Sequence, residues 1–424
     1  MGCGSSRPVA IPPELVPVDG KAPSIQVPSK QGGGGSVAKP PQQEQKQKQQ
    51  QQDQQQQSVD DGKIFEDRDF PATVDTITKD TNNENYQTYK DALWRRPHEI
   101  MNCNYDEIKV FDTIDVNDIA QGLLGNCYFL TSLSGLAEVP ERVKEIFQTS
   151  TVNKNGKYTM RFYVRGVPTM ITVDDRFPCS HEEPYNLLFS KPNGKELWAI
   201  LLEKAWAKLF KGYTNIEAGT MEEALEHLTG APSFDYFLQN ESEDETWNKL
   251  KYADSMEFTI AAGTKGNVHE STGIVEGHAY TIYSVHEVQG HKLLRLRNPW
   301  GSFEWKGDFS DSSPLWTDAL KKAVQYEDAD NGMFFMTLKD FRTFYNYYSV
   351  HRYHKDWHYS YVEQKSGPKH ANYYKFSVDK PCEAYFRIHQ EDKRSLPTQE
   401  ERDNFKYSPA SFMIIKVEKN GQYK

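Results

Sequence analysis

Three side chains in this sequence have the types and the order that acyl transfer through a thiol requires. Cys127 lies within QGLLGNCYFLTSLSG, and the later stretches GHAYTI and LRNPWG supply His278 and Asn298. A nucleophilic cysteine needs a base that accepts its proton, and the base needs a third group that holds it in place. Cysteine, histidine and asparagine in this order can fill these three roles.

The residues around Cys127 predict that it lies in the first turn of a helix. Gly122 and Gly125 indicate a turn, and apolar residues then recur at helical spacing from Phe129 to Ala137. The unpaired N–H groups and the positive dipole end of a helix favour the thiolate, which is the nucleophilic form. Because a cysteine entering a helix often only packs, the interpretation depends on its downstream partners.

His278 and Asn298 are predicted to lie at one end of a β-hairpin. The alternating stretches HAYTIYSVHEV and KLLRLRNPW flank Gln289 and Gly290, which form a turn signal. Antiparallel pairing of the two stretches places the histidine and the asparagine toward the same open end. There an amide oxygen can set the tautomer of the imidazole.

The composition limits the classes of partner and compartment. The chain has 424 residues and a formal net charge of -10 without a sustained basic block, which argues against a nucleic-acid surface. The cysteines are scattered and show no C-x-x-C spacing, so neither a disulfide framework nor a zinc site is predicted. Apart from the nucleophile and Cys3, they are interpreted as structural: Cys103, Cys179 and Cys382. No apolar stretch approaches the roughly 20 residues that span a bilayer, and we expect a cytoplasmic protein.

The N-terminus carries a lipidation pattern. MGCGSSR fits the N-myristoylation motif at Gly2, and Cys3 beside it is a candidate for palmitoylation. Two lipids would hold the chain persistently at the inner face of a membrane, whereas one gives only marginal binding. The Gly/Pro-rich and Gln-rich residues that follow cannot bury a core and predict a disordered tether. A pattern this short also arises by chance.

Together the motifs resemble those of calpain-type cysteine proteases. The resemblance is carried by QGLLGNCYFL, GHAYTI and LRNPWGSFEWKGDFSD, and also by FEDRDFPA, LWRRPHEI and ELWAILLEKAWAKLFKGY. It covers the chain from about Phe65 to Tyr353. It implies an α+β fold with a papain-like core of two subdomains, in which a helical half carries the cysteine and a mainly β half carries the histidine and the asparagine.

The resemblance and the changes in composition divide the chain into four predicted parts. Residues 1–60 form the disordered tail, residues 61–212 the subdomain with the cysteine, and residues 213–353 the subdomain with the histidine and the asparagine. In residues 354–424, the alternating stretches NYYKFSV, EAYFRI and SFMIIKV predict strands of a β-sandwich. This last part is shorter than a usual sandwich of about 100 residues, so we expect a partial domain.

The resemblance also implies roles for individual residues. Cys127 matches the nucleophile, His278 the general base and acid, and Asn298 the residue that orients the imidazole. Gln121 matches the glutamine whose amide, together with the N–H of Cys127, stabilises the tetrahedral oxyanion. Trp300 matches the tryptophan that forms an active-site wall between the two halves.

Calpain-type proteases are regulated by calcium bound in each half, and the acidic residues at matching positions are the expected ligands. These are Asp118 and Glu203 in the first half and Glu304 and Asp311 in the second. The family's acidic DGE is NGM here, with Asn331 and Met333 where carboxylates are expected. Fewer carboxylates weaken the attraction for a divalent ion.

Two further departures flank the nucleophile, because the family's GDCW is GNCY here. Asn126 removes a carboxylate beside Cys127, which we expect to ease thiolate formation. Tyr128 is expected to keep an aromatic wall and to add a hydroxyl, which would affect substrate preference.

The resemblance implies an intracellular, calcium-regulated cysteine endopeptidase that performs limited proteolysis of protein substrates. Two alternatives remain open at this point. One is a catalytically silent, membrane-tethered scaffold that keeps the fold. The other is a transglutaminase-type acyl-transfer enzyme, a class that usually orients its histidine with aspartate, whereas this chain offers Asn298.

Overall fold

The computed structural model describes residues 63–192, 194–363, 374–378, 381–396 and 398–414, together with the strand Ser24–Gln26. The chain forms two compact units. One comprises Met1–Val59 and His358–Tyr385, and the other comprises Asp60–Trp357 and Phe386–Lys424. The second unit carries the predicted triad. The predicted lipidation sites Gly2 and Cys3 and most of the predicted tail lie outside the described residues.

The predicted β-sandwich is not confirmed. In the first unit, β1 (Ser24–Gln26) pairs in parallel with β12 (Lys375–Ser377). Within the described residues that follow β12, the regular elements are the short turn η6 (Lys393–Ser395) and the helix α12 (Gln399–Asn404). The stretch EAYFRI is irregular there, and its apolar residues Phe386 and Ile388 are exposed. Alternating residues need a paired neighbour strand and a covered face to form a stable sheet, and the described residues supply neither to the stretch EAYFRI.

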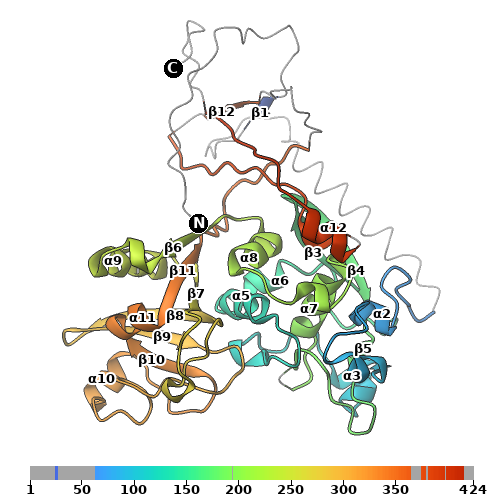
Figure 1. The fold of residues 1–424 in the computed structure, drawn as a ribbon, viewed down its shortest axis with the longest axis horizontal. Helices are drawn as coiled ribbons and strands as arrows, with labels where there is room; N and C mark the ends of the chain where they lie inside the picture. Colours follow the sequence, from blue (N-terminus) through green and yellow to red (C-terminus); the bar gives the residue numbers. More distant parts are fainter. Residues whose placement is uncertain are drawn as a thin grey trace, which may run out of the picture. The chain divides into compact units, whose positions relative to one another are not determined.

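The cysteine-bearing part of the second unit is mainly helical around one large core (Figure 1). Its two longer helices, α5 and α7, are buried over nearly their whole length, as expected for helices at the centre of a core. Its helices are α2 (Val74–Ile77), α3 (Tyr86–Lys90), α4 (Pro97–Ile100), α5 (Cys127–Ala137), α6 (Pro140–Lys144), α7 (Trp198–Leu209) and α8 (Met221–Thr229), with the short turns η1 (Tyr105–Glu107), η2 (Val116–Asp118) and η3 (Thr214–Ile216). Two antiparallel pairs accompany them: β2 (Leu93–Arg95) with β5 (Phe177–Cys179), and β3 (Lys157–Val164) with β4 (Val167–Asp174).

The histidine-bearing part is built on a six-stranded antiparallel sheet in the order β10-β9-β8-β7-β11-β6. Its strands are β6 (Ser233–Phe237), β7 (Thr259–Thr264), β8 (Ala279–Val288), β9 (His291–Arg297), β10 (Met333–Thr337) and β11 (Tyr345–His351). The helices α9 (Glu243–Ser255), α10 (Asp318–Ala323) and α11 (Leu338–Phe344) and the turns η4 (Leu238–Asn240) and η5 (Glu270–Thr272) complete it. The hairpin predicted around Gln289 and Gly290 is present as β8 and β9, so that His278 and Asn298 flank its open end.

Helix α5 and the sheet are joined by direct contacts. Thr131 Oγ1 donates to the carbonyl of Ala279 at 3.2 Å, and Thr281 Oγ1 donates to the carbonyl of Thr131 at 3.1 Å. Gly135 permits the close approach, because a Cβ there would lie 2.4 Å from Cγ2 of Thr259 in β7. The helix that begins with the cysteine is therefore fixed to the strand that begins after the histidine.

The core changes later along the chain than the predicted boundary at 212/213. Buried residues of α8, among them Met221 and Leu228, pack into the cysteine-bearing core, whereas Leu238 belongs to the core of the sheet. Helix α8 is amphipathic and buries one face against α5, which explains its placement. The border between the two parts therefore lies between α8 and β6.

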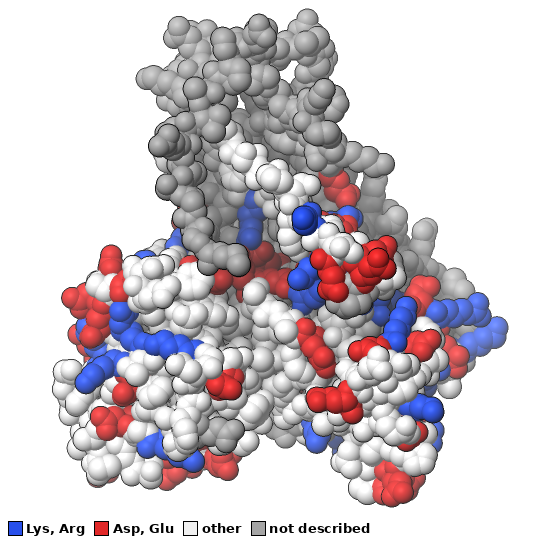
Figure 2. All heavy atoms as spheres, in the orientation of Figure 1, with Lys and Arg blue, Asp and Glu red and all other residues white. Residues whose placement is uncertain are grey.

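The charged side chains are interspersed, as Figure 2 shows for the face that it draws. Among the described residues, every helix falls short of the length and hydropathy that a membrane-crossing segment needs.

The hydrogen bonds of the buried His351 side chain are sensitive to acid. Its ring nitrogens bond to the hydroxyls of Thr229 at 2.8 Å and Ser233 at 2.9 Å, and it is fully buried. Burial, with a smaller contribution from Arg142, lowers its pKa to about 3. Burial also lowers the pKa of three further histidines to about 4: His227, His278 and His389.

We expect the protein to lose stability as the pH falls from about 6.5 to 4. An unfolded histidine has a pKa of about 6.5, so in this window the unfolded chain binds more protons than the folded one, and the free energy of unfolding rises with pH. The stabilising difference is fully present above pH 6.5. Thermal unfolding measured across this range tests it, with His351→Gln as the comparison. Near pH 5, the acid-dependent loss in the free energy of unfolding should be roughly 2 kcal/mol smaller for the variant than for the wild type. An unchanged pH profile would contradict the assignment of this loss to His351.

Candidate active site

Cys127 occupies the first residue of α5, as predicted. Asn126 precedes the helix without capping it through its side chain. Its amide Nδ2 instead donates to Oε1 of Glu203 at 2.8 Å, and the residue is fully buried. The turn before the nucleophile is thereby held from inside the core.

The environment of the Cys127 thiol contains two opposing influences. Burial raises its pKa, while the backbone N–H groups of Ala279, Tyr128 and Cys127 itself lower it, and burial prevails. Burial therefore disfavours the charged form of this thiol, and the effect of Asn126 in place of a carboxylate stays a prediction. The contact with Ala279 has a second consequence: this residue follows His278 directly, so the thiol and the imidazole lie at the same junction.

His278 is held on two sides. Its backbone N–H donates to Thr264 Oγ1 at 2.8 Å, and its Nε2 bonds to Oδ1 of Asn298 at 2.9 Å. The ring is nearly buried and packs against Trp300, with ring centroids 4.8 Å apart. Thr264 was not predicted from the sequence, since it lies on a neighbouring strand with no motif of its own.

The hydrogen bonds of Asn298 determine the tautomer of His278. Its Nδ2 donates to the carbonyls of Ser302 and Phe303, each at 3.0 Å. Its Oδ1 accepts from the backbone N–H of Trp300 at 3.1 Å, so this oxygen faces the imidazole, whose Nε2 must carry the proton. Nδ1 is then the unprotonated nitrogen. Burial lowers the pKa of His278 to about 4, with Asn298 offsetting part of the effect, so the ring is neutral at pH 7 and can accept a proton.

The two remaining predicted site residues border this group. Gln121 is half-buried, and its amide Nε2 donates to the carbonyl of Leu124 at 2.7 Å. The side chain is thus tied to the turn that precedes the nucleophile, and a second N–H remains on the amide. Trp300 covers one face of His278 and is 41% exposed, a position consistent with a wall beside the imidazole.

Tyr128 does not form the predicted aromatic wall. It is 3% exposed, and its hydroxyl donates to the carbonyl of Ile216 at 3.1 Å. The same hydroxyl accepts from Trp206 Nε1 at 3.1 Å and from Arg394 Nη1 at 2.9 Å. Helical rotation from Cys127 to the next residue turns the ring into the core, so a direct effect on substrate preference is not supported.

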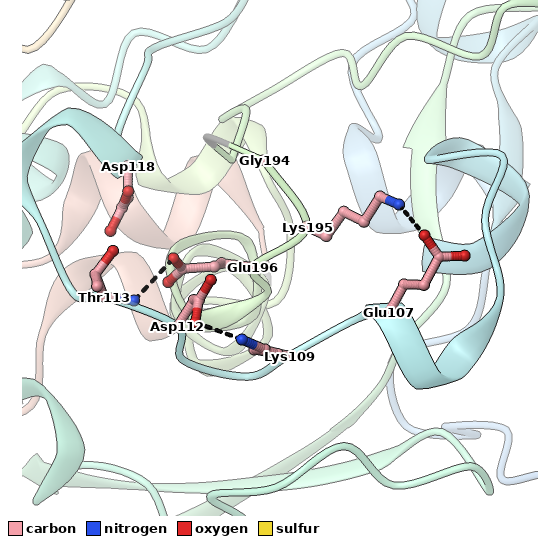
Figure 3. A pocket seen from close by; sticks show the side chains of 8 residues that line it. All are labelled: Glu107, Lys109, Asp112, Thr113, Asp118, Gly194, Lys195 and Glu196. Atoms are coloured by element: carbon pink, nitrogen blue, oxygen red, sulfur yellow. Dashed lines mark hydrogen bonds and ion pairs between the residues drawn. The ribbon is translucent and has the colours of Figure 1, made fainter.

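In the first half, Asp118 shares a hollow with Glu196 and not with Glu203. The hollow has a volume of about 170 Å³ and is also lined by Asp112 and Thr113. Figure 3 shows the side chains of Asp118, Thr113 and Glu196 directed toward one another. Burial raises the pKa of Asp118 and of Glu196, and the charge of Asp118 raises that of Glu196 further.

This hollow offers oxygen atoms to a hard cation, although the described residues include no group of three or more His, Cys, Asp or Glu side chains that could hold a metal ion. Glu196 Oε1 accepts from the N–H of Thr113 at 3.2 Å, while its buried Oε2 has no hydrogen-bond partner. Oxygen ligands from carboxylates and backbone carbonyls are those that calcium prefers. The charge of a bound cation would compensate the unpaired Oε2 of Glu196 and the repulsion between the carboxylates of Asp118 and Glu196.

The prediction for Glu203 therefore requires a correction. Its Oε1 accepts from Asn126, and its Oε2 accepts from Ser190 Oγ at 2.6 Å and Ser190 N at 3.1 Å. Glu203 lies inside α7, where it is buried in the core, whereas Glu196 lies in the loop before this helix. Both residues are in the motif ELWAILLEK. The helix begins between them, at Trp198, so only Glu203 is part of it.

In the second half, Glu304 and Asp311 lie together as predicted. Burial and a hydrogen bond with Asp311 raise the pKa of Glu304 to about 7. Glu304 Oε1 also accepts from the backbone N–H groups of Asn331 at 3.1 Å and Gly332 at 2.7 Å. Met333, where a carboxylate was expected, packs partly buried against the cysteine-bearing core. The pair offers carboxylate oxygens to a cation, with fewer of them than the family pattern implies.

A thiol at the start of a helix whose sulfur faces the N–H of the residue after His278, together with a neutral imidazole that an amide oxygen holds in one tautomer, is the set of groups that a cysteine hydrolase needs. A model of the family described as "Calpain family cysteine protease" matches residues 65–352. The chain therefore belongs to the calpain family of cysteine proteases, as the sequence motifs predicted.

Individual relatives agree with this assignment. The chain is 35% identical over 295 residues to "Calpain-type cysteine protease DEK1" of Arabidopsis thaliana and 34% identical over 294 residues to "Calpain-14" of Homo sapiens. It is 33% identical over 294 residues to "Calpain clp-4" of Caenorhabditis elegans. Each match covers 66% of this chain, but 14%, 42% and 40% of the respective relatives. The chain thus matches less than half the length of each of these proteins.

Proposed function

We propose that this protein is a calcium-regulated cysteine endopeptidase that performs limited proteolysis through Cys127, His278 and Asn298. The observation that supports it most is the bond from His278 Nε2 to Asn298 Oδ1, made by an amide whose other end is fixed to two carbonyls. This leaves Nδ1 as a base beside the helix that carries the thiol. Protein substrates are the partners of this activity.

The geometry supports a two-step acyl transfer. The Cys127 sulfur attacks the carbonyl carbon of the scissile peptide bond while its proton passes to Nδ1 of His278. The imidazolium gives this proton to the leaving amine, and the acyl group remains on sulfur as a thioester. Water then attacks the thioester and passes a proton through His278 back to the thiol. The amide of Gln121 and the N–H of Cys127 are the proposed donors to the oxyanion in both steps.

Labelling by an electrophilic peptidyl probe for active-site thiols tests whether this site assembles. We expect the probe to attach to Cys127 in the presence of calcium and less without it, because the resting thiol is held neutral by burial. Labelling that is absent at every calcium concentration would favour the catalytically silent scaffold. Incorporation of amines into glutamine side chains without peptide cleavage would favour the transglutaminase alternative.

Calcium regulation is proposed for the carboxylates of both halves. Asp118 and Glu196 would hold the ion in the first half, and Glu304 and Asp311 would hold it in the second. Bound calcium would supply the positive charge that these buried carboxylates lack.

A substitution at Glu196 tests the first of these sites. Glu196→Gln is expected to raise the calcium concentration for half-maximal response by about tenfold, which corresponds to the loss of ~1.4 kcal/mol of attraction. The response can be followed by tryptophan fluorescence as well as by cleavage. Asp112→Asn is the matched control, because this carboxylate lines the same hollow but pairs with Lys109 at 2.5 Å. An equal response of Glu196→Gln and the wild type would exclude the proposed ligand.

A cytoplasmic location with a lipid tether at Gly2 and Cys3 is proposed from the sequence pattern. It is independent of catalysis. A Gly2→Ala variant is expected to move from the membrane fraction to the soluble fraction, and its retention on membranes would contradict the tether.

A further inference from the structure

A segment beyond the residues matched by the family model contacts the cysteine-bearing core. The segment comprises residues 386–396, which begin the second stretch of this unit and include η6. Figure 1 shows the chain running toward α12 on the side of the core that carries α8 and β3. The family model ends at residue 352, so this segment lies outside the residues that the model matches.

Charged groups of the core anchor the segment. Arg387 pairs with Glu222 at 3.4 Å and also with Glu226 on helix α8. Arg165, in the turn between β3 and β4, pairs with Glu391 at 2.5 Å, and Lys211 Nζ donates to the carbonyl of Ser395 at 2.6 Å. Arg165 and Glu391 are largely exposed, where such pairs contribute little. We therefore expect a more buried ion pair to hold the segment more strongly.

Arg394 forms this more buried ion pair. Its side chain is 13% exposed and forms an ion pair with Glu223 on α8. The guanidinium packs over the ring of Phe210 at 4.8 Å from the centroid. Its Nη1 donates to the hydroxyl of Tyr128 at 2.9 Å and to the carbonyl of Ala218 at 3.3 Å. A planar guanidinium suits such a fork of several acceptors better than an ammonium does.

The two acceptors of Arg394 Nη1 lead to both sides of the nucleophile. Tyr128 follows Cys127 directly. On the other side, the N–H of Ala218 donates to the carbonyl of Gly125 at 2.9 Å, and Gly125 lies two residues before Cys127. One guanidinium therefore fixes both ends of the short stretch in which the thiol lies.

The connection to Tyr128 is specific to a tyrosine at this position. Its hydroxyl has one proton and two lone pairs, and all three are used, by the carbonyl of Ile216, Trp206 Nε1 and Arg394 Nη1. The backbone N–H of the same residue faces the sulfur of Cys127, where it favours the thiolate. A shift of the ring would move this N–H.

We propose that Arg394 is a positioning residue for the nucleophile, acting through Tyr128 and through Ala218 on the first turn of α5. The charge of Arg394 is balanced by Glu223, so the effect arises from placement of the turn. This proposal rests on the assignment of Cys127 as the nucleophile. It extends the active site to a segment outside the two halves of the protease core.

The test uses the full chain and measures how fast iodoacetamide alkylates Cys127 between pH 6 and 10, with the labelled peptide identified by mass spectrometry. Arg394→Met is expected to slow alkylation at neutral pH about fivefold, as the loss of one charge-assisted hydrogen bond would. The midpoint of the pH profile should rise, because the turn no longer holds its N–H groups toward sulfur. Arg394→Lys should restore part of the rate.

Two further variants separate positioning from general anchoring. Tyr128→Phe removes the hydroxyl, and with it the hydrogen bonds to Arg394, Trp206 and Ile216. It leaves the pair of Arg394 with Glu223, so it should slow alkylation in the same direction. In the double variant the two effects should be less than additive, because part of the effect of Arg394 passes through its bond to Tyr128. Arg387→Met, which removes a neighbouring anchor without a contact to Tyr128, should stay within twofold of the wild type.

The proposal is overturned if Arg394→Met melts cooperatively and alkylates within twofold of the wild type, or if Arg387→Met slows alkylation equally. If Arg394→Met does not fold, Tyr128→Phe decides: an unchanged rate and pH profile would overturn the proposal. Alkylation needs no substrate cleavage. A wild-type protein that cleaves no peptide, yet shows alkylation that depends on Arg394, would refute the proposed endopeptidase and leave the positioning role intact.

Discussion

Replacing His278 with glutamine is expected to lower kcat for peptide cleavage by about 10²- to 10⁴-fold, the range that a positioned acid–base group contributes. Glutamine can still donate to Oδ1 of Asn298, so the buried acceptor keeps a partner. It cannot accept the proton of Cys127. The loss should therefore appear in kcat, with KM and the midpoint of thermal unfolding nearly unchanged.

The matched control is His286→Gln in the same hairpin. His286 is also partly buried, and its Nε2 bonds to Ser284 Oγ at 2.8 Å within strand β8. It has no contact with Asn298 among the described hydrogen bonds, so its replacement should leave kcat within twofold of the wild type. Equal activity of the His278→Gln protein and the wild type would remove the imidazole from the mechanism.

Replacing Lys204 with methionine is expected to lower the midpoint of thermal unfolding by roughly 5 °C or more. Lys204 is fully buried in α7, and its Nζ donates to Asp174 Oδ1 and to the carbonyl of Arg176, each at 2.5 Å. Burial opposes the charge of Asp174, but Lys204 and Arg176 outweigh it and lower its pKa to about 2. The methionine would leave a buried carboxylate with only part of its compensation.

The carboxylate of Asp174 also holds Asp67, near the N-terminal end of the second unit. Asp174 Oδ2 accepts from the backbone N–H of Asp67 at 2.9 Å, and Asp67 pairs with Lys208 at 2.7 Å. Adding Asp174→Asn to Lys204→Met should recover part of the loss, because no buried charge remains unpaired. Lys251→Met removes an exposed pair with Glu287 and should shift the midpoint by about 1 °C or less. Equal shifts for the two lysine substitutions would contradict the assignment.

Local patterns predicted the elements that carry the triad. The helical spacing after Cys127 and the alternation on both sides of the turn are set by nearest neighbours in the sequence, and both elements formed where expected. Gln289 and Gly290 both have positive φ, at 49° and 82°, as a tight hairpin turn requires. The neighbourhood of His278 and Asn298 follows from the pairing of these strands.

Residues whose roles depend on distant contacts could not be assigned in this way. Glu196 and Glu203 are both acidic residues of one motif, and only the start of α7 places one in a hollow and the other in the core. The place of Tyr128 on the helix turns its ring inward, and there Trp206 and Arg394 complete the hydrogen bonds of its hydroxyl. Neither partner is marked by spacing from the nucleophile.

The C-terminal prediction was limited for a related reason. Alternation of apolar and polar residues indicates a strand only where another strand pairs with it. Phe386 and Ile388 alternate correctly but are exposed. The segment that follows them is instead fixed by ion pairs with α8, an interaction between residues far apart in the sequence that alternation does not indicate.

The central claim is that Cys127 acts as the nucleophile of a calcium-regulated endopeptidase. The most direct test is cleavage of casein by the purified full chain and by Cys127→Ala, titrated with calcium under reducing conditions. We predict cleavage that rises with calcium and is absent from the variant. Absence of cleavage at every calcium concentration, or equal cleavage by Cys127→Ala, would contradict the account, and full activity without calcium would contradict its regulation.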